Sequence, residues 1–206
     1  GIPSRARVSA DGRLGGVTTF VSGHSYTEIG GFSTQAMIID MVTGRPIVTS
    51  LEDWPVTRDG ARLESIDENF WGITFAPDGD TFYATLATGG TTYLVRGSVK
   101  SRSMAVIHQN AECPSVSPDG RRIAYKKRTG PDGLWRLTVL DLATMTETPP
   151  AGDQPIDDQV EWLDDRTIIY GLGEAIWSVP ADGGGRAERL LPSANSPSVV
   201  REEAVR

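Results

Sequence analysis

The stretch that decides the fold expected for this chain reads Ser-Pro-Asp-Gly-Arg-Arg-Ile-Ala-Tyr at residues 117–125. Pro118 fixes φ at the first central position of a turn, and Asp119 can accept a hydrogen bond from a nearby backbone N–H. Gly120 takes a positive φ without steric cost. The β-prone Ile-Ala-Tyr run follows directly, so the stretch predicts a strand, a tight turn and a second strand.

The phrase recurs along the chain. Related copies lie at residues 8–13 and 75–80, and a degraded copy lies at 162–167, where Asp-Arg replaces Asp-Gly. We expect that last turn to differ from the others or to carry some strain. The turn residues predicted from the three better copies are Asp11, Gly12, Asp78, Gly79, Pro118, Asp119 and Gly120.

The spacing of the copies predicts propeller blades. Asp11, Asp78, Asp119 and Asp165 are 67, 41 and 46 residues apart, and the last two intervals fit a four-stranded blade. The first interval is too long, so residues 49–69 and 23–33 are interpreted as inserted loops. The expected blades are approximately 4–57, 70–110, 113–150 and 157–191.

A second hairpin is expected after each first one. Residues 134–140 alternate apolar Trp135, Leu137 and Val139 with polar side chains, which is the period of a strand with unlike faces. No segment predicts a helix of ordinary length; the best candidate, 198–206, is short and terminal. The predicted fold class is therefore all-β, a propeller of four-stranded antiparallel blades.

The string at 117–125 closely resembles the repeat of TolB-like propellers, and residues 76–79 and 9–12 match it more loosely. The resemblance covers nearly the whole chain and implies a six-bladed ring, of which about four blades are present. Residues 195–200 resemble the opening of a further blade. A four-bladed ring, or closure by self-association through open strand edges, is the alternative.

Composition narrows the function classes. The 206 residues carry 20 Lys and Arg against 27 Asp and Glu, a net charge of −7, which argues against nucleic acid and anionic lipid as partners. No stretch approaches the roughly 18 apolar residues of a membrane span. The single Cys113 is expected to be buried and inert. Because the chain begins at Gly1, we expect a processed or truncated product.

Motifs for chemistry are missing from the sequence. It contains no Gly-x-Ser-x-Gly elbow, no phosphate-binding loop and only two histidines, so no catalytic residue and no cofactor are predicted.

The candidate binding residues lie in the two insertions. Trp54 and Asp53 stand in the longer one, and His24 and Tyr26 stand in the Gly-Ser-rich one. A tryptophan folded onto its own blade is the competing interpretation. Asp157 and Asp158, within an acidic segment, are the candidate metal ligands, with a solvated loop as the alternative.

The function expected by resemblance is a non-enzymatic interaction or scaffold module that binds a protein partner in the cell envelope, at an extracytoplasmic location. The alternative is a hydrolase-associated propeller or a metal-dependent, lactonase-like enzyme. A purely structural assembly is a third possibility.

Overall fold

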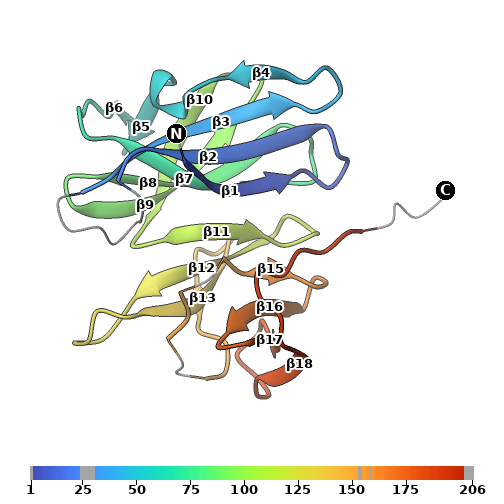
Figure 1. Cartoon of the computed structure of the whole chain (residues 1–206). Coiled ribbons are helices and arrows are strands. Elements are labelled where there is room, and N and C mark those ends of the chain that lie inside the picture. Colours follow the sequence, from blue (N-terminus) through green and yellow to red (C-terminus); the bar gives the residue numbers. More distant parts are fainter. Residues whose placement is uncertain (1, 24–30, 153–154, 158, 202–206) are drawn as a thin grey trace. The chain divides into compact units, whose positions relative to one another are not determined.

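The computed structural model describes residues 2–23, 31–152, 155–157 and 159–201. The chain divides into two compact units, 1–112 and 113–206, and each contains two blades (Figure 1). Three of the four sheets have four antiparallel strands, and the second has six. Within the described ranges the only helix is the three-residue 3-10 helix η1 (Leu51–Asp53). The predicted all-β propeller fold is confirmed.

The first unit contains two sheets, and each is formed by one continuous stretch of the chain. The first sheet has the order β1-β2-β3-β4, and the second has the order β6-β5-β10-β9-β8-β7. Their bounds are β1 (Ile2–Val8), β2 (Leu14–Ser22), β3 (Ser33–Asp40), β4 (Arg45–Val48), β5 (Val56–Arg58), β6 (Ala61–Arg62), β7 (Asn69–Phe75), β8 (Thr81–Thr88), β9 (Thr91–Ser98) and β10 (Ser103–Gln109).

The second unit repeats the plain four-stranded arrangement twice, in the orders β11-β12-β13-β14 and β15-β16-β17-β18. The bounds are β11 (Glu112–Val116), β12 (Arg122–Arg128), β13 (Trp135–Asp141), β14 (Glu147–Thr148), β15 (Glu161–Trp162), β16 (Thr167–Leu172), β17 (Ala175–Pro180) and β18 (Glu188–Pro192). Residues 195–200, which resemble the opening of a further blade, pair with no strand among the described residues.

The repeated phrase forms the turns after β1, β7 and β11, and its degraded copy forms the turn after β15. Asp119 accepts hydrogen bonds from the Ser117 hydroxyl (2.6 Å) and the Arg121 N–H (3.0 Å), and Gly120 has φ +71°. Asp78 accepts from the N–H groups of Asp80 and Thr81 at 2.9 and 2.7 Å. The side chain thus replaces water at backbone donors that the turn leaves without a partner.

The first copy behaves in the same way. The Ser9 hydroxyl donates to Asp11 at 2.6 Å and the Arg13 N–H donates at 3.1 Å, and the hydroxyl contact is the main reason that the pKa of Asp11 is lowered. Gly12 and Gly79 have φ +70° and +71°, a region that favours glycine.

The degraded fourth turn uses a different aspartate from the one used to measure the spacing. Asp164, rather than Asp165, accepts from the N–H groups of Arg166 and Thr167, both at 2.7 Å. Asp165 instead accepts from the Asp119 N–H at 2.8 Å, which ties the fourth turn to the third. The Leu163 N–H donates to the Thr167 carbonyl, four positions on, whereas the Ser117 N–H of the third copy donates to the Arg122 carbonyl, five positions on. The fourth turn therefore differs from the third, as the sequence predicted.

The longer insertion, residues 49–69, is more than a loop. It forms η1, β5 and β6, and β5 pairs in parallel with β10, with Val56 opposite Met104 (Figure 1). The Met104 N–H donates to the carbonyl of Pro55 at 2.9 Å. The insertion therefore extends the second sheet to six strands and covers the outer edge of β10.

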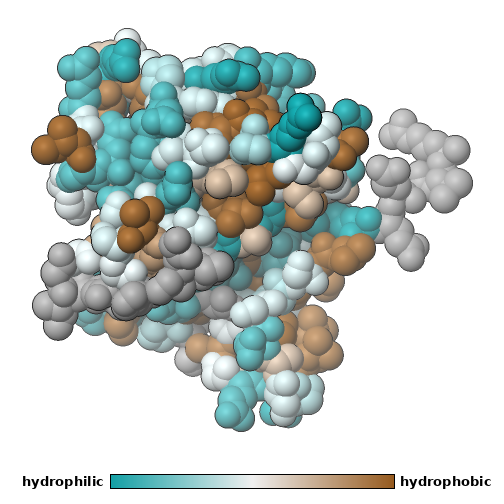
Figure 2. Space-filling model, turned by 45° about the horizontal axis from the view of Figure 1, so that its top comes forward, coloured by the Kyte–Doolittle hydropathy of each residue, from teal (hydrophilic) through white to brown (hydrophobic). Residues whose placement is uncertain are grey.

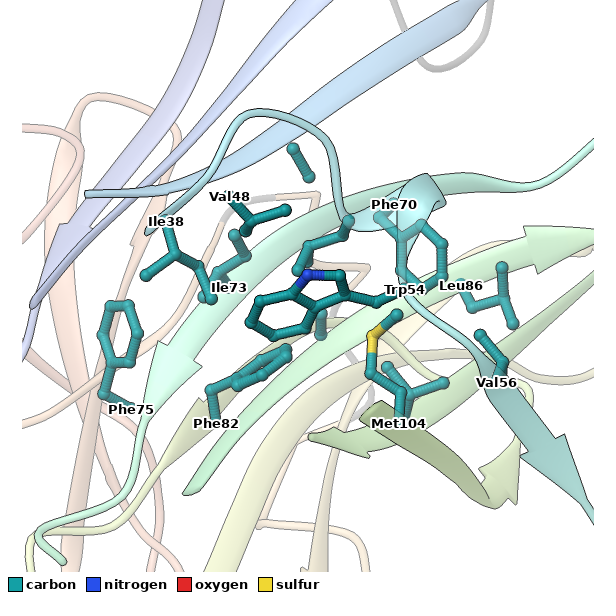
Figure 3. Packing of buried hydrophobic residues seen from close by; sticks show 14 of the residues in the cluster. Ile38, Val48, Trp54, Val56, Phe70, Ile73, Phe75, Phe82, Leu86 and Met104 are labelled. Atoms are coloured by element: carbon teal, nitrogen blue, oxygen red, sulfur yellow. The ribbon is translucent and has the colours of Figure 1, made fainter. Parts of the chain in front are cut away.

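The core of the first unit lies between its two sheets, because β7 packs against β1, β2 and β3. Ile38, Phe70 and Phe82 are fully buried there. Figure 3 shows the indole ring of Trp54 over Phe82, with Met104 nearby. The insertion thus contributes apolar side chains to the same core as the sheets.

The core of the second unit joins its own two sheets. Trp162 is fully buried, and its indole N–H donates to the carbonyl of Ser115 at 2.8 Å. The guanidinium of Arg122 lies 5.2 Å from the centre of the same ring. Ile168 and Val139 belong to the same buried cluster.

Candidate functional site

The insertion builds a cleft of about 590 Å³, and two predicted binding residues, Asp53 and Trp54, line it. The other lining residues come from η1, β5, β6 and the segment before β7: Glu52, Pro55, Val56, Arg62, Leu63, Glu64, Ser65, Ile66 and Glu68. A volume of this size is in the range of pockets that hold ligands.

One wall of the cleft is held by η1. Leu51 is fully buried and anchors the turn, and the Trp54 N–H donates to the Leu51 carbonyl at 3.0 Å. Because Leu51 and Trp54 point into the core, Asp53 is left exposed at the cleft. The two apolar residues, with two acids between them, therefore anchor the turn in the core and leave Asp53 at the surface.

Trp54 is chiefly a packing residue. Only 8% of it is exposed, and its ring centre lies 6.1 Å from that of Phe82. Trp54 therefore folds onto its own blade, as the competing interpretation expected, and does not protrude toward a partner. Only the edge of the residue is left to face a partner.

The opposite wall is tied to the β8–β9 turn by Asp67. This carboxylate accepts from the hydroxyls of Ser65 (2.5 Å) and Thr88 (2.6 Å) and from the Gly89 N–H (2.9 Å). These bonds, the Ser65 contact first, lower the pKa of Asp67 to about 2. The segment that carries Glu64, Ser65 and Ile66 is thereby fixed to the second sheet.

Two half-buried carboxylates lie deeper in the cleft. Glu52 accepts from the Ser50 hydroxyl at 2.5 Å and from the Phe70 N–H at 3.2 Å, yet burial raises its pKa. Burial also raises the pKa of Glu68, and the negative charges of Glu52 and Asp67 add to the effect, while Arg62 opposes it. The cleft therefore concentrates negative charge where water is partly excluded.

No ion pair among the described residues neutralises the four acids that line the cleft, Glu52, Asp53, Glu64 and Glu68. Arg62 is the one basic residue of the lining. Four carboxylates against one guanidinium leave an excess of three negative charges. Such a surface attracts cationic groups.

The structure describes one of the two predicted metal ligands. Asp157 is exposed, and its carboxylate forms an ion pair with Lys126 Nζ at 2.6 Å. Asp158 lies outside the described residues. Elsewhere in the described part of the chain, no three His, Cys, Asp or Glu side chains gather as a metal site would require. The metal site stays a prediction.

The remaining predicted binding residues, His24 and Tyr26, also lie outside the described residues. Sequence reasoning missed Glu52, Glu64 and Glu68, although a signal was present: the insertion is rich in acids between residues 52 and 68. The neighbouring Ile66 was missed as well, and it is fully exposed beside the cleft.

Exposed apolar side chains are not confined to the cleft. Figure 2 shows hydrophobic residues among hydrophilic ones on the face it presents. Val42 and Val200 are also exposed. Exposure of a single apolar residue therefore says little by itself. None of the described residues forms a helix of the length and apolarity that a membrane span requires.

Comparison with known proteins gives a likeness of fold. No family model matches the sequence, and no curated protein matches it. Among solved structures, a putative TolB from Agrobacterium tumefaciens is 14% identical with a TM-score of 0.59, over 89% of this chain and 63% of its own. The chain thus spans less than two thirds of that structure.

Structures of enzymes are similar to the chain as well. A puromycin-hydrolysing peptidase of Mycobacterium tuberculosis is 14% identical with a TM-score of 0.60, over 97% of this chain and 30% of its own. An oligogalacturonate lyase, solved with manganese, is 17% identical with a TM-score of 0.52, over 91% of this chain and 51% of its own. At these identities the likeness shows a shared propeller fold, and the TolB-like character of the chain is suggested by that fold alone.

Proposed function

We propose that this chain is a non-enzymatic, TolB-like binding module that serves as an interaction or scaffold module of the cell envelope. Its partner-binding surface is the cleft of the insertion. The observation that carries the proposal is a cleft of about 590 Å³ with four carboxylates that no described ion pair neutralises. Carboxylates left without an opposite charge at a concave surface are typical of a site for a complementary partner.

The construction of the cleft supports binding. Leu51 and Trp54 fix one wall in the core, and the hydrogen bonds of Asp67 fix the other. A cleft that is formed before the partner arrives loses little conformational entropy on binding. An insertion kept only as a linker would not need anchors of this kind.

The cellular location follows from the resemblance of residues 117–125 to TolB-like repeats, with the fold likeness to a putative TolB as support. We therefore propose an extracytoplasmic location. Alkaline phosphatase joined to the full-length protein is active only after export, so an inactive fusion in the native host would contradict this location.

A second candidate is the propeller of a hydrolase or of a metal-dependent, lactonase-like enzyme. It is favoured by the similar propellers of a peptidase and of a lyase that binds manganese. The ion pair of Asp157 with Lys126 weighs against a metal there, since a cation would compete with the ammonium group. Saturable binding of Mn²⁺ or Ca²⁺ that is lost on Asp157→Asn would favour this candidate.

Site-specific photo-crosslinking tests the binding surface. A photoreactive amino acid is placed at Ile66, beside the cleft, and in a matched variant at Glu174, an exposed turn of the last sheet. In cells of the native host, we expect a discrete cross-linked protein from position 66 only. Equal products from both positions, or none from position 66, would contradict the proposed surface.

A further inference from the structure

We infer that the insertion cleft receives a basic, partly apolar segment of a protein partner, with Lys or Arg side chains set against its carboxylates and an aliphatic side chain against Ile66 and Leu63. The inference rests on the proposed function and names the chemistry of the partner that this site takes.

Charge is the first argument. The eleven lining residues carry an excess of three negative charges, while the whole chain of 206 residues carries seven. A large part of the net charge is therefore concentrated at one concave surface. Field lines focus in a cleft with low-dielectric walls, which raises the local concentration of cationic groups.

The positions of the acids indicate where a cationic group would bind. Glu52 and Asp53 come from η1, whereas Glu64 and Glu68 come from the segment before β7, so both walls carry negative charge. Glu52 and Glu68 are partly desolvated, and their charges already repel one another. A cationic side chain placed between the two walls would relieve that repulsion.

Apolar surface is the second argument. Ile66 is fully exposed, Leu63 is half-buried, and Trp54 and Pro55 also line the cleft. Apolar contacts favour an occupant with hydrocarbon of its own over a small hydrated cation. A polypeptide with alternating basic and aliphatic side chains supplies both kinds of contact.

The test uses the full chain and a fluorescein-labelled hexapeptide of alternating Lys and Leu, with binding followed by fluorescence anisotropy. We expect saturable binding that weakens as salt rises. The double substitution Glu64→Gln with Glu68→Gln should weaken it by about tenfold, the loss of a pair of favourable ionic contacts. Ile66→Ser should weaken it by about threefold, because one aliphatic contact is lost.

A matched double variant, Glu174→Gln with Glu188→Gln, removes the same charge from exposed positions of the second unit. It should change the affinity by less than about twofold. Equal weakening by both double variants would overturn the inference in favour of general charge attraction. Tight, stoichiometric binding of Ca²⁺ that excludes the peptide would overturn it in favour of a metal site.

Peptide specificity separates the two proposals. A hexapeptide of alternating Glu and Leu should not bind, and one of alternating Lys and Ser should bind more weakly than the Lys-Leu peptide. If the Lys-Leu peptide fails to bind while position 66 still cross-links a protein, the inference is wrong and the proposed function stands. If neither occurs, both are wrong.

Discussion

The second and third sheets begin with the same phrase and differ at their outer edges. In the second, β10 has seven residues, and β5 of the insertion pairs with it in parallel. In the third, the edge strand β14 has two residues, and the Tyr125 hydroxyl and Lys127 ammonium groups both bond the Glu147 carboxylate there. One edge is covered by added chain and apolar side chains. The other is kept short and held by polar groups, and both arrangements limit unwanted strand pairing.

Inside the sheets, one cross-strand pair shows how the same topology accepts different side chains. The residue four positions after the turn aspartate is Phe82 in the second sheet, opposite Gly97, and Ile123 in the third, opposite Leu140. The second sheet fills this place with a ring and a glycine, and the third fills it with two aliphatic side chains. The turn phrase therefore sets the register of the two strands, whereas packing sets only the combined volume of the paired side chains.

The largest expected effect is at Trp54. Trp54→Ala should lower the free energy of unfolding of the first unit by about 3–5 kcal/mol, because a buried indole and its contact with Phe82 are lost. Trp135 of the third sheet is half-buried, with Lys126 Nζ and the Arg128 guanidinium 4.6 and 4.1 Å from its ring centre. Trp135→Ala should cost only about 1–2 kcal/mol.

Urea unfolding followed by circular dichroism measures both tryptophan variants without relying on the fluorescence of the residue removed. Equal losses would mean that the insertion contributes no more to its sheet than an exposed hairpin does. The proposed contrast between a covered and a short edge would then fail.

The next effect is at the Phe82–Gly97 pair. A Cβ at Gly97 would lie 2.1 Å from Cζ of Phe82, a ring that is fully buried. Gly97→Ala should therefore cost about 1–3 kcal/mol. The double variant Phe82→Ile with Gly97→Leu imports the pair of the third sheet, and its loss should be smaller than the sum of the single losses. A double-mutant cycle in urea measures the coupling, and additive losses would contradict the volume argument.

A smaller effect is expected where the first strands of the two sheets bend. Gly72 and Cys113 each precede their turn aspartate by six residues, and both have positive φ, +66° and +51°. Gly72→Ala should cost about 1 kcal/mol, since the left-handed region disfavours a Cβ. Cys113 is buried, as predicted, and strained.

Cys113→Gly removes the strain together with the thiol, whereas Cys113→Ala removes only the thiol. We expect the glycine variant to be the more stable of the two by about 1 kcal/mol in chemical denaturation. An alanine variant that is the more stable would show that the left-handed backbone costs nothing here.

The smallest effect concerns the pH dependence of Asp67. Its pKa in the folded chain is about 2, below the ordinary value of 3.8, so its contribution to stability is complete above that ordinary value and is lost as pH falls toward 2. Asp67→Asn should lower the urea midpoint at pH 6, and the difference should shrink as pH falls through about 2. A difference at pH 2 as large as that at pH 6 would show that the charged form is not what holds the cleft wall.

Asp132 of the third sheet is the matched case. Its pKa is also lowered to about 2, chiefly by the side chain of Arg136 within the same hairpin. Asp132→Asn should show the same pH dependence without weakening peptide binding at the cleft.

Much of the fold could be predicted from sequence because it depends on local chemistry. The Pro-Asp-Gly turns set φ and hydrogen bonding within a few residues, and alternation marks the strands. The insertion could not be predicted in detail. Its strand β5 has three residues and pairs with β10 across more than forty positions of the chain, so no local pattern marks it.

For the candidate site the division is similar. The sequence indicated the right segment, through Asp53 and Trp54, and the acids nearby were visible in it. Which acids face a cleft was decided by Leu51 and Trp54, which turn inward, and by Asp67, which binds the β8–β9 turn.

The repeated hairpins and the propeller fold could therefore be predicted from the sequence, since they depend on residues that are close along the chain. That an expected loop forms two strands and a cleft is seen only in the folded chain. That outcome depends on burial against β10 and Phe82, contacts between residues that the chain brings together only when it folds.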